Sequence, residues 1–227
     1  MKPLIYKELK LAMHPICYVF IFLFPLMLLI PSYPLGIGFI YVLTCYPILF
    51  LGANKGQQSN DLLFSTLLPV RKKDIVKARI ITVILMQLTF SLIISALYPL
   101  AIMINESVLK SAPDPEKYAT PGLGLNSYVL VLAFAIIGLA LADLIFFPIY
   151  YKKGRSIVMS TLLTILGFVV YIGVTTVGLP YIPGCEGINE LHIGIQFAIL
   201  AGALLASFGL HLLVYYISAK RLEKVDF

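Results

Sequence analysis

The sequence predicts an all-α integral membrane protein with six transmembrane helices, because it is strongly apolar and its few charges are clustered. Of its 227 residues, 60% are hydrophobic and 12% are charged, and the mean hydropathy is +0.95. Soluble proteins are typically about 45–50% apolar and about 25% charged, which excludes a soluble enzyme. Charge-free runs cover residues 16–54, 80–105, 118–142, 156–185 and 191–219.

The individual spans follow from the length that a bilayer requires. A transmembrane helix needs about 20 mostly apolar residues, so the first run contains two helices, separated by Pro31-Ser32-Tyr33-Pro34. Each of the other runs contains one helix. The predicted spans are 16–31, 35–53, 80–104, 126–150, 157–179 and 193–217, within a single transmembrane domain over 1–227 that has extracellular loops at 105–125 and 180–192.

The distribution of basic residues predicts the orientation. Of the 17 Lys and Arg, all but Lys110 and Lys117 fall in the N-terminus, the 54–79 loop, the 152–155 turn or the C-terminal tail. Basic residues in short connections are retained in the cytoplasm, so an N-in, C-in topology is predicted. This partition also explains the sequence pI near 9.1, and no nucleic-acid partner is expected.

Two cytoplasmic segments have the pattern of short amphipathic helices. The interfacial segment 1–15 contains a helix over 3–14 whose faces separate at 100° per residue, with Lys7, Lys10 and His14 on one side. It is either a basic anchor or a moving element. In the 54–79 loop, Ser59 or Asn60 can cap a second helix that Pro69 ends. Its apolar surface is expected to dock on lipid, on the chain itself or, as the favoured interpretation, on a cytoplasmic partner.

No catalytic, cofactor-binding or metal-ligating residues are predicted. The sequence contains no phosphate-binding Gly-x-x-x-x-Gly-Lys-Ser/Thr loop, no His-Glu-x-x-His and no Gly-x-Ser-x-Gly nucleophile turn. His14, His192 and His211 lie far apart in the sequence, and they are interpreted as isolated polar or interfacial residues. The chain is therefore not expected to be an enzyme by itself.

Asp143 is the only acidic residue within a predicted span. It lies nine residues before Lys152, or roughly 13 Å at 1.5 Å per residue, which places it near the middle of the bilayer. An ionised group there is costly and should face the protein interior or water. Asp143 either fixes its helix to a neighbour by hydrogen bonding, or has a role with substrate, cation or proton.

The second amphipathic helix and the residues that follow it carry a family resemblance. The stretch that resembles the signature loop of six-helix permeases of the ATP-binding-cassette type-2 family is Leu62-Leu63-Phe64-Ser65-Thr66-Leu67-Leu68-Pro69-Val70-Arg71-Lys72-Lys73-Asp74-Ile75-Val76-Lys77-Ala78-Arg79. Phe147-Pro148-Ile149-Tyr150-Tyr151-Lys152-Lys153-Gly154 resembles the Pro-x-Tyr-Phe-Lys-x-Gly turn that follows their fourth helix. Among relatives, the chain is most similar to permeases of bacterial exporters of toxic or amphipathic peptides, which implies a multi-pass location in the bacterial plasma membrane.

The resemblance implies a half-transporter that works as a homodimer with separate ATPase subunits. The chain would hold no cofactor, and ATP and Mg²⁺ would bind to the partner ATPase. The helix at 3–14 would be the elbow helix, and the loop helix would couple to the ATPase through Asn60, Asp61, Leu63, Phe64, Leu67, Leu68 and Arg71.

Helices one, two and five of two copies would then enclose the substrate path. Its wall residues would include Phe20, Phe24, Met27, Phe39, Tyr46, Phe168 and Tyr171. None of these spans contains a charge, so the path should favour an amphipathic peptide or a lipid-like molecule. Two alternatives stay open, namely an ion-coupled secondary transporter and a non-transporting membrane scaffold or immunity protein.

Overall fold

The computed structural model describes residues 2–13, 15–26, 70–111, 128–152, 157–175, 187–188 and 191–224. The elements in these ranges are helices, and no strand occurs among the described residues, which confirms the all-α prediction there. They are α1 (Lys2–Lys7), the π-helical segment η1 (Glu8–Ala12), α2 (Pro15–Leu26), α5 (Lys72–Ser111), α7 (Tyr128–Lys152), α8 (Ile157–Gly173) and α9 (Ile193–Glu223).

Three of these helices are long and apolar enough to cross a membrane. The spans cover Lys72–Leu100, Val129–Lys152 and Ile193–Glu223. A fourth span is possible if Lys2–Lys10 and Pro15–Leu26, which are bent by 77° relative to each other, count as one, and α8 is a shorter apolar helix. The predicted second span at 35–53 and the predicted coupling helix lie outside the described residues, so the total of six spans stays a prediction.

Helix α5 extends beyond its predicted span of 80–104 at both ends. The carbonyl oxygen of Arg71 accepts hydrogen bonds from the backbone N–H groups of Asp74 and Ile75, at 2.8 and 3.4 Å. Asp74 also places a negative charge in the first turn, which favours a helix start. At the other end, α5 continues to Ser111, into the stretch predicted as an extracellular loop.

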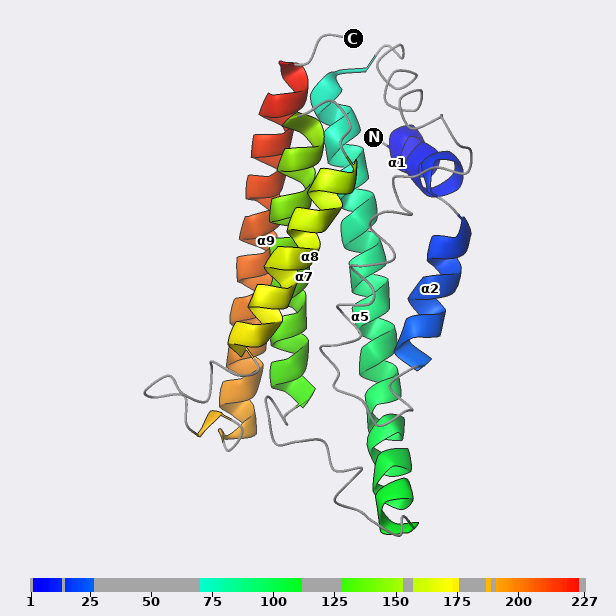
Figure 1. The fold of residues 1–227 in the computed structure, drawn as a ribbon, viewed down its shortest axis with the longest axis vertical. Coiled ribbons are helices and arrows are strands. Elements are labelled where there is room, and N and C mark those ends of the chain that lie inside the picture. Colours follow the sequence, from blue (N-terminus) through cyan, green and yellow to red (C-terminus); the bar gives the residue numbers. More distant parts are fainter. Residues whose placement is uncertain are drawn as a thin grey trace.

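The long helices form a bundle in which α5 and α8 run opposite to α7 and α9 (Figure 1). Both chain ends, the start of α5 and the start of α8 lie at one end of the bundle, and α7 and α9 run back towards it. At this end Arg221 of α9 donates a hydrogen bond to the carbonyl oxygen of Pro148 in α7. The predicted N-in, C-in topology requires this arrangement, while the side of the membrane stays a prediction.

The apolar core lies where α2, α5, α7, α8 and α9 meet. Its buried members include Ile21, Phe24, Val76, Phe90, Phe146, Phe147, Phe168, Val214 and Leu222. Large apolar side chains are also exposed on the outside of the bundle, as at Leu205 of α9. The buried face of α9, by contrast, contains Gln196, Ser207, His211 and Ser218. Apolar residues outside and polar residues inside are what a helix in lipid requires.

An ion pair ties the N-terminal segment to α5. Glu8 of η1 accepts a hydrogen bond from Arg79, with 2.7 Å between Oε2 and Nε, and both side chains are buried. Lys7 Nζ lies 3.5 Å from the other carboxylate oxygen of Glu8. Tyr18 of α2 donates a hydrogen bond to the carbonyl oxygen of Leu9, which holds η1 against the first turn of α2.

Gly138 allows α7 and α8 to approach closely. A Cβ atom at this position would lie 2.6 Å from the Tyr171 ring and 3.0 Å from the Phe168 ring. The Tyr171 ring cannot easily move away, because its hydroxyl donates a 2.6 Å hydrogen bond to the carbonyl oxygen of Phe134. We therefore expect Gly138→Val to lower the free energy of unfolding by about 1–3 kcal/mol through overpacking.

The measurement is thermal unfolding of the purified protein in lipid nanodiscs. Gly209→Val is the matched control, since nothing lies within 4 Å of a Cβ atom built there and both sites are helical. The control is expected to unfold close to the wild-type temperature. Equal losses in the two variants would show that the α7–α8 approach does not depend on Gly138.

Candidate functional site

A single carboxylate oxygen connects three helices in the interior of the bundle. Asp143 of α7 is fully buried. Its Oδ2 accepts a hydrogen bond from Nε2 of Gln87 in α5 at 2.9 Å, and it lies 3.0 Å from Nε2 of His211 in α9. We call Gln87, Asp143 and His211 the polar triad.

The three side chains meet because they lie at the same depth in the bundle. Asp143 lies nine residues before Lys152, His211 lies nine residues before Lys220, and Gln87 lies ten residues after Lys77. At 1.5 Å per residue these intervals correspond to roughly 13–15 Å. Since the three basic residues belong to the end of the bundle where α5 starts and α7 and α9 finish (Figure 1), the triad forms well inside the apolar layer.

The contacts of His211 determine how many protons the pair holds. His211 Nδ1 lies 2.7 Å from the carbonyl oxygen of Ser207, which can only accept, so Nδ1 carries a hydrogen. Nε2 faces a carboxylate oxygen at 3.0 Å, and two lone pairs would repel each other at that distance. One proton therefore lies between Nε2 and Oδ2, which makes the pair an imidazolium with a carboxylate or a neutral imidazole with a carboxylic acid.

Both forms leave the pair without net charge. A charge without a partner is costly in a membrane interior, and a paired one is less so. The interpretation of His211 as an isolated residue is wrong, because it contacts Asp143. If Asp143 serves to fix its helix to neighbouring helices, it needs hydrogen-bond partners on them, and Gln87 and His211 are such partners. A role of Asp143 with substrate, cation or proton stays a prediction.

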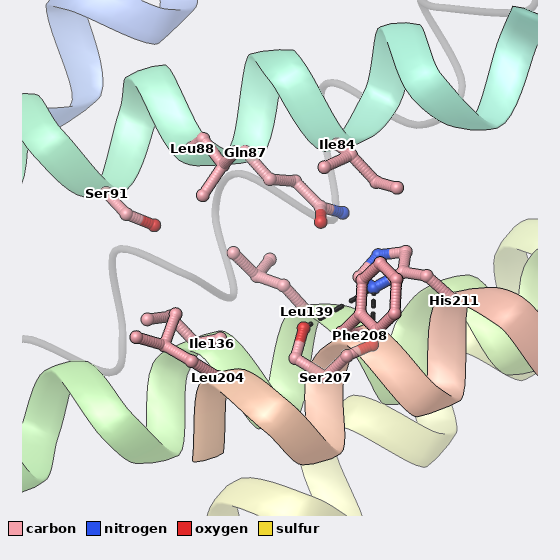
Figure 2. A pocket seen from close by; sticks show the side chains of 10 residues that line it. All are labelled: Ile84, Gln87, Leu88, Ser91, Ile136, Leu139, Leu204, Ser207, Phe208 and His211. Carbon is pink, nitrogen blue, oxygen red and sulfur yellow. Dashed lines mark hydrogen bonds between the residues drawn. The ribbon is translucent and has the colours of Figure 1, made fainter. Parts of the chain in front are cut away.

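Beside the triad is a pocket of about 180 Å³. Figure 2 shows its lining side chains, which are Ile84, Gln87, Leu88, Ser91, Ile136, Leu139, Leu204, Ser207, Phe208 and His211. Gln87 and Ser91 lie one turn apart on α5, and Ser207 and His211 lie one turn apart on α9. The two polar pairs therefore face each other across an otherwise apolar space. Within the described ranges, no three His, Cys, Asp or Glu residues are grouped as a metal ion would need.

The predicted cavity residues that fall within the described ranges do not line this pocket. Phe20 and Phe24 stack in α2 with their ring centroids 4.8 Å apart, and the rings of Phe168 and Tyr171 lie 6.1 Å apart in α8. Phe24 and Phe168 are buried in the apolar core, and Phe20 and Tyr171 pack against it. Met27, Phe39 and Tyr46 lie outside the described residues, and the cavity role of all seven stays a prediction.

Most of the predicted coupling residues also lie outside the described ranges. These are Asn60, Asp61, Leu63, Phe64, Leu67 and Leu68. Arg71 is described and is exposed directly before α5, at the end of the bundle that contains both termini. Its contact with an ATPase stays a prediction.

Comparison with known proteins now identifies the family. Residues 3–222 match the family described as ABC-2 family transporter protein. The chain belongs to this family. This ABC-2 permease is thus the membrane component of an ABC transporter and a multi-pass membrane protein. No curated protein and no solved structure matches the chain.

The coupling between Asp143 and His211 can be measured with a double-mutant cycle. Asp143→Leu leaves the buried His211 without its acidic partner, and His211→Leu leaves the buried Asp143 with one hydrogen-bond partner fewer. We expect each single change to lower the free energy of unfolding by about 2–4 kcal/mol. The double change is expected to cost at least about 1 kcal/mol less than the sum, as measured by equilibrium unfolding in mixed micelles.

The control cycle combines Asp143→Leu with His192→Leu. His192 is exposed at the start of α9, and its side chain accepts a local hydrogen bond from the Gly194 N–H, so these two effects should add. Additive losses in the Asp143–His211 cycle would mean that the contact contributes nothing to stability.

Proposed function

We propose that this ABC-2 permease is the membrane-spanning subunit of an ATP-driven exporter. In this proposal two copies enclose the substrate path, and separate ATPase subunits bind at the cytoplasmic ends and supply the energy. The observation that carries the proposal is the family match, which covers residues 3–222 of the 227. The substrate class is an amphipathic peptide or lipid-like molecule, because the spans predicted to line the path contain no charge.

The ion pair between η1 and α5 supports a mechanical role for the N-terminal segment. The predicted coupling loop leads directly into α5 through Arg71, and two turns later Arg79 binds Glu8. A displacement of the loop would therefore act on the start of α5 and on η1 together. Both side chains of the pair are buried, and breaking a buried ion pair is costly, which favours movement of the two segments as one unit.

The coupling assignment predicts the effect of charges on the loop helix. Leu63→Asp combined with Leu67→Asp is expected to abolish association with the ATPase subunit, because two carboxylates would have to be buried without partners. The measurement is copurification of the ATPase with the tagged permease, followed by ATP hydrolysis in lipid. Ser65→Asp with Thr66→Asp adds the same charge to polar positions of the same segment and should preserve association. If the leucine variant kept both association and transport, the loop helix would not be the coupling element.

A second candidate function is an ion-coupled secondary transporter, favoured by the proton shared between Asp143 and His211. The two functions differ in their energy source. In inside-out vesicles containing permease and ATPase, we expect uptake of a fluorescent cationic amphipathic helix to require ATP and to persist when an ionophore collapses the pH gradient. Asp143→Asn should retain this uptake if Asp143 only fixes helices. Uptake that runs without ATP, follows an imposed pH gradient and is lost in Asp143→Asn would favour the secondary transporter.

A further inference from the structure

The pocket between α5, α7 and α9 is mostly apolar, with a few polar side chains in its floor and an apolar rim. Gln87, Leu139, Ser207 and His211 are all buried at its base, whereas the rim residues Leu88, Leu204 and Phe208 are exposed, Phe208 to 65%. In Figure 2 the Ser91 and Ser207 hydroxyls project into the space between α5 and α9. A contact between helices that only needed apolar packing would require none of these polar groups.

The floor can form further hydrogen bonds. Ser91 accepts a bond from Ser95 through its backbone carbonyl, but its hydroxyl has no hydrogen-bond partner among the described residues. The Ser207 hydroxyl lies 3.4 Å from His211 Nδ1, a long contact for a hydroxyl. A hydroxyl that faces an apolar space without a good partner raises the free energy, so a bound group that donates or accepts there would be stabilised.

Size and charge restrict the occupant. A volume of about 180 Å³ is several times the roughly 30 Å³ that one water takes up in the liquid, and an apolar cavity of about 150 Å³ can hold a benzene-sized group. Among the described residues that line the pocket, His211 is the only ionisable one, and with Asp143 it forms a pair without net charge. These lining residues therefore offer no counter-ion to a charged ligand, and the exposed rim is apolar.

We propose that this pocket is a binding site for an uncharged amphiphile that enters from the bilayer. The apolar part of the ligand packs between Ile136, Leu139 and Leu204, and its hydroxyl or amide group bonds to Ser91 or Ser207. The site lies within one chain, on helices other than those predicted to enclose the path between two copies. Gln87 and His211 both line the pocket and both contact Asp143. A ligand bound in the pocket would therefore touch the two side chains through which α5 and α9 are connected.

The test is photolabelling of the purified permease in nanodiscs with three eight-carbon probes that carry a diazirine at the same position. The probes are an alcohol, an alkane and an amine that is charged at neutral pH. The alcohol is expected to label Leu88, Leu204 or Phe208 about fivefold more than the alkane, the ratio that one net hydrogen bond gives. The amine should label these residues no more than the alkane does.

Two sets of variants separate a site from general contact with lipid. Ser91→Ala with Ser207→Ala should remove the preference for the alcohol and leave alkane labelling unchanged. Leu204→Trp should fill the pocket and abolish specific labelling, whereas Leu205→Trp, at the neighbouring exposed position outside the pocket, should not. If Leu204→Trp does not fold, the serine variant decides the outcome.

The proposal is overturned if the alcohol and the alkane label equally in the wild type, or if the serine variant keeps the preference. Stronger labelling by the amine would mean that the site takes a cation instead. Labelling needs neither ATP nor the ATPase subunit, so its result is independent of whether the chain works in an exporter.

Discussion

The bundle depends on the burial of one carboxylate in its apolar layer. Asp143 can remain there only if hydrogen-bond partners reach it, and Gln87 and His211 supply them from α5 and α9. A helix turns by 100° per residue, so a shift of either neighbour by one position would point its polar side chain away. The triad therefore fixes both the depth and the rotation of three helices relative to one another. Apolar packing alone tolerates more variation, because many apolar side chains can replace each other at a contact.

The membrane setting also explains why the buried face of α9 includes polar side chains. In lipid, an apolar side chain gains little by turning inward, since the acyl chains are as apolar as leucine. Association relies on close packing and on hydrogen bonds between helices. Both appear where α7 meets its neighbours: Gly138 lets the Phe168 and Tyr171 rings approach, and Arg221 reaches the carbonyl oxygen of Pro148. A pocket with hydroxyl groups next to the triad is consistent with an interior of this kind.

Hydropathy and charge were sufficient to predict the helical class, and the spans at 80–104, 126–150 and 193–217 overlap α5, α7 and α9. The ends of α5 were not predicted, because the Arg71 carbonyl and Asp74 start the helix before the apolar run begins. Asp143 was singled out because acidic residues are rare in a transmembrane span, but the residues that contact it were not predicted. They lie 56 and 68 residues away, and hydropathy does not say which helices touch. The equal spacing of Asp143 and His211 from the basic ends of their helices was a signal that could have paired them.

One helix connects the parts of the molecule that the proposed exporter must move together. Along α5, Arg71 precedes the first turn, Arg79 binds Glu8 of η1, and Gln87 binds Asp143. The three positions are eight residues apart, which is about 12 Å along the axis and about 80° of rotation for each step. A continuous helix is stiff over this length, so α5 cannot tilt or turn at its start without moving η1 and the triad. Force applied at the coupling loop would thus reach the middle of the bilayer through backbone hydrogen bonds of one helix. No chain of rearranging side chains is needed for that transmission.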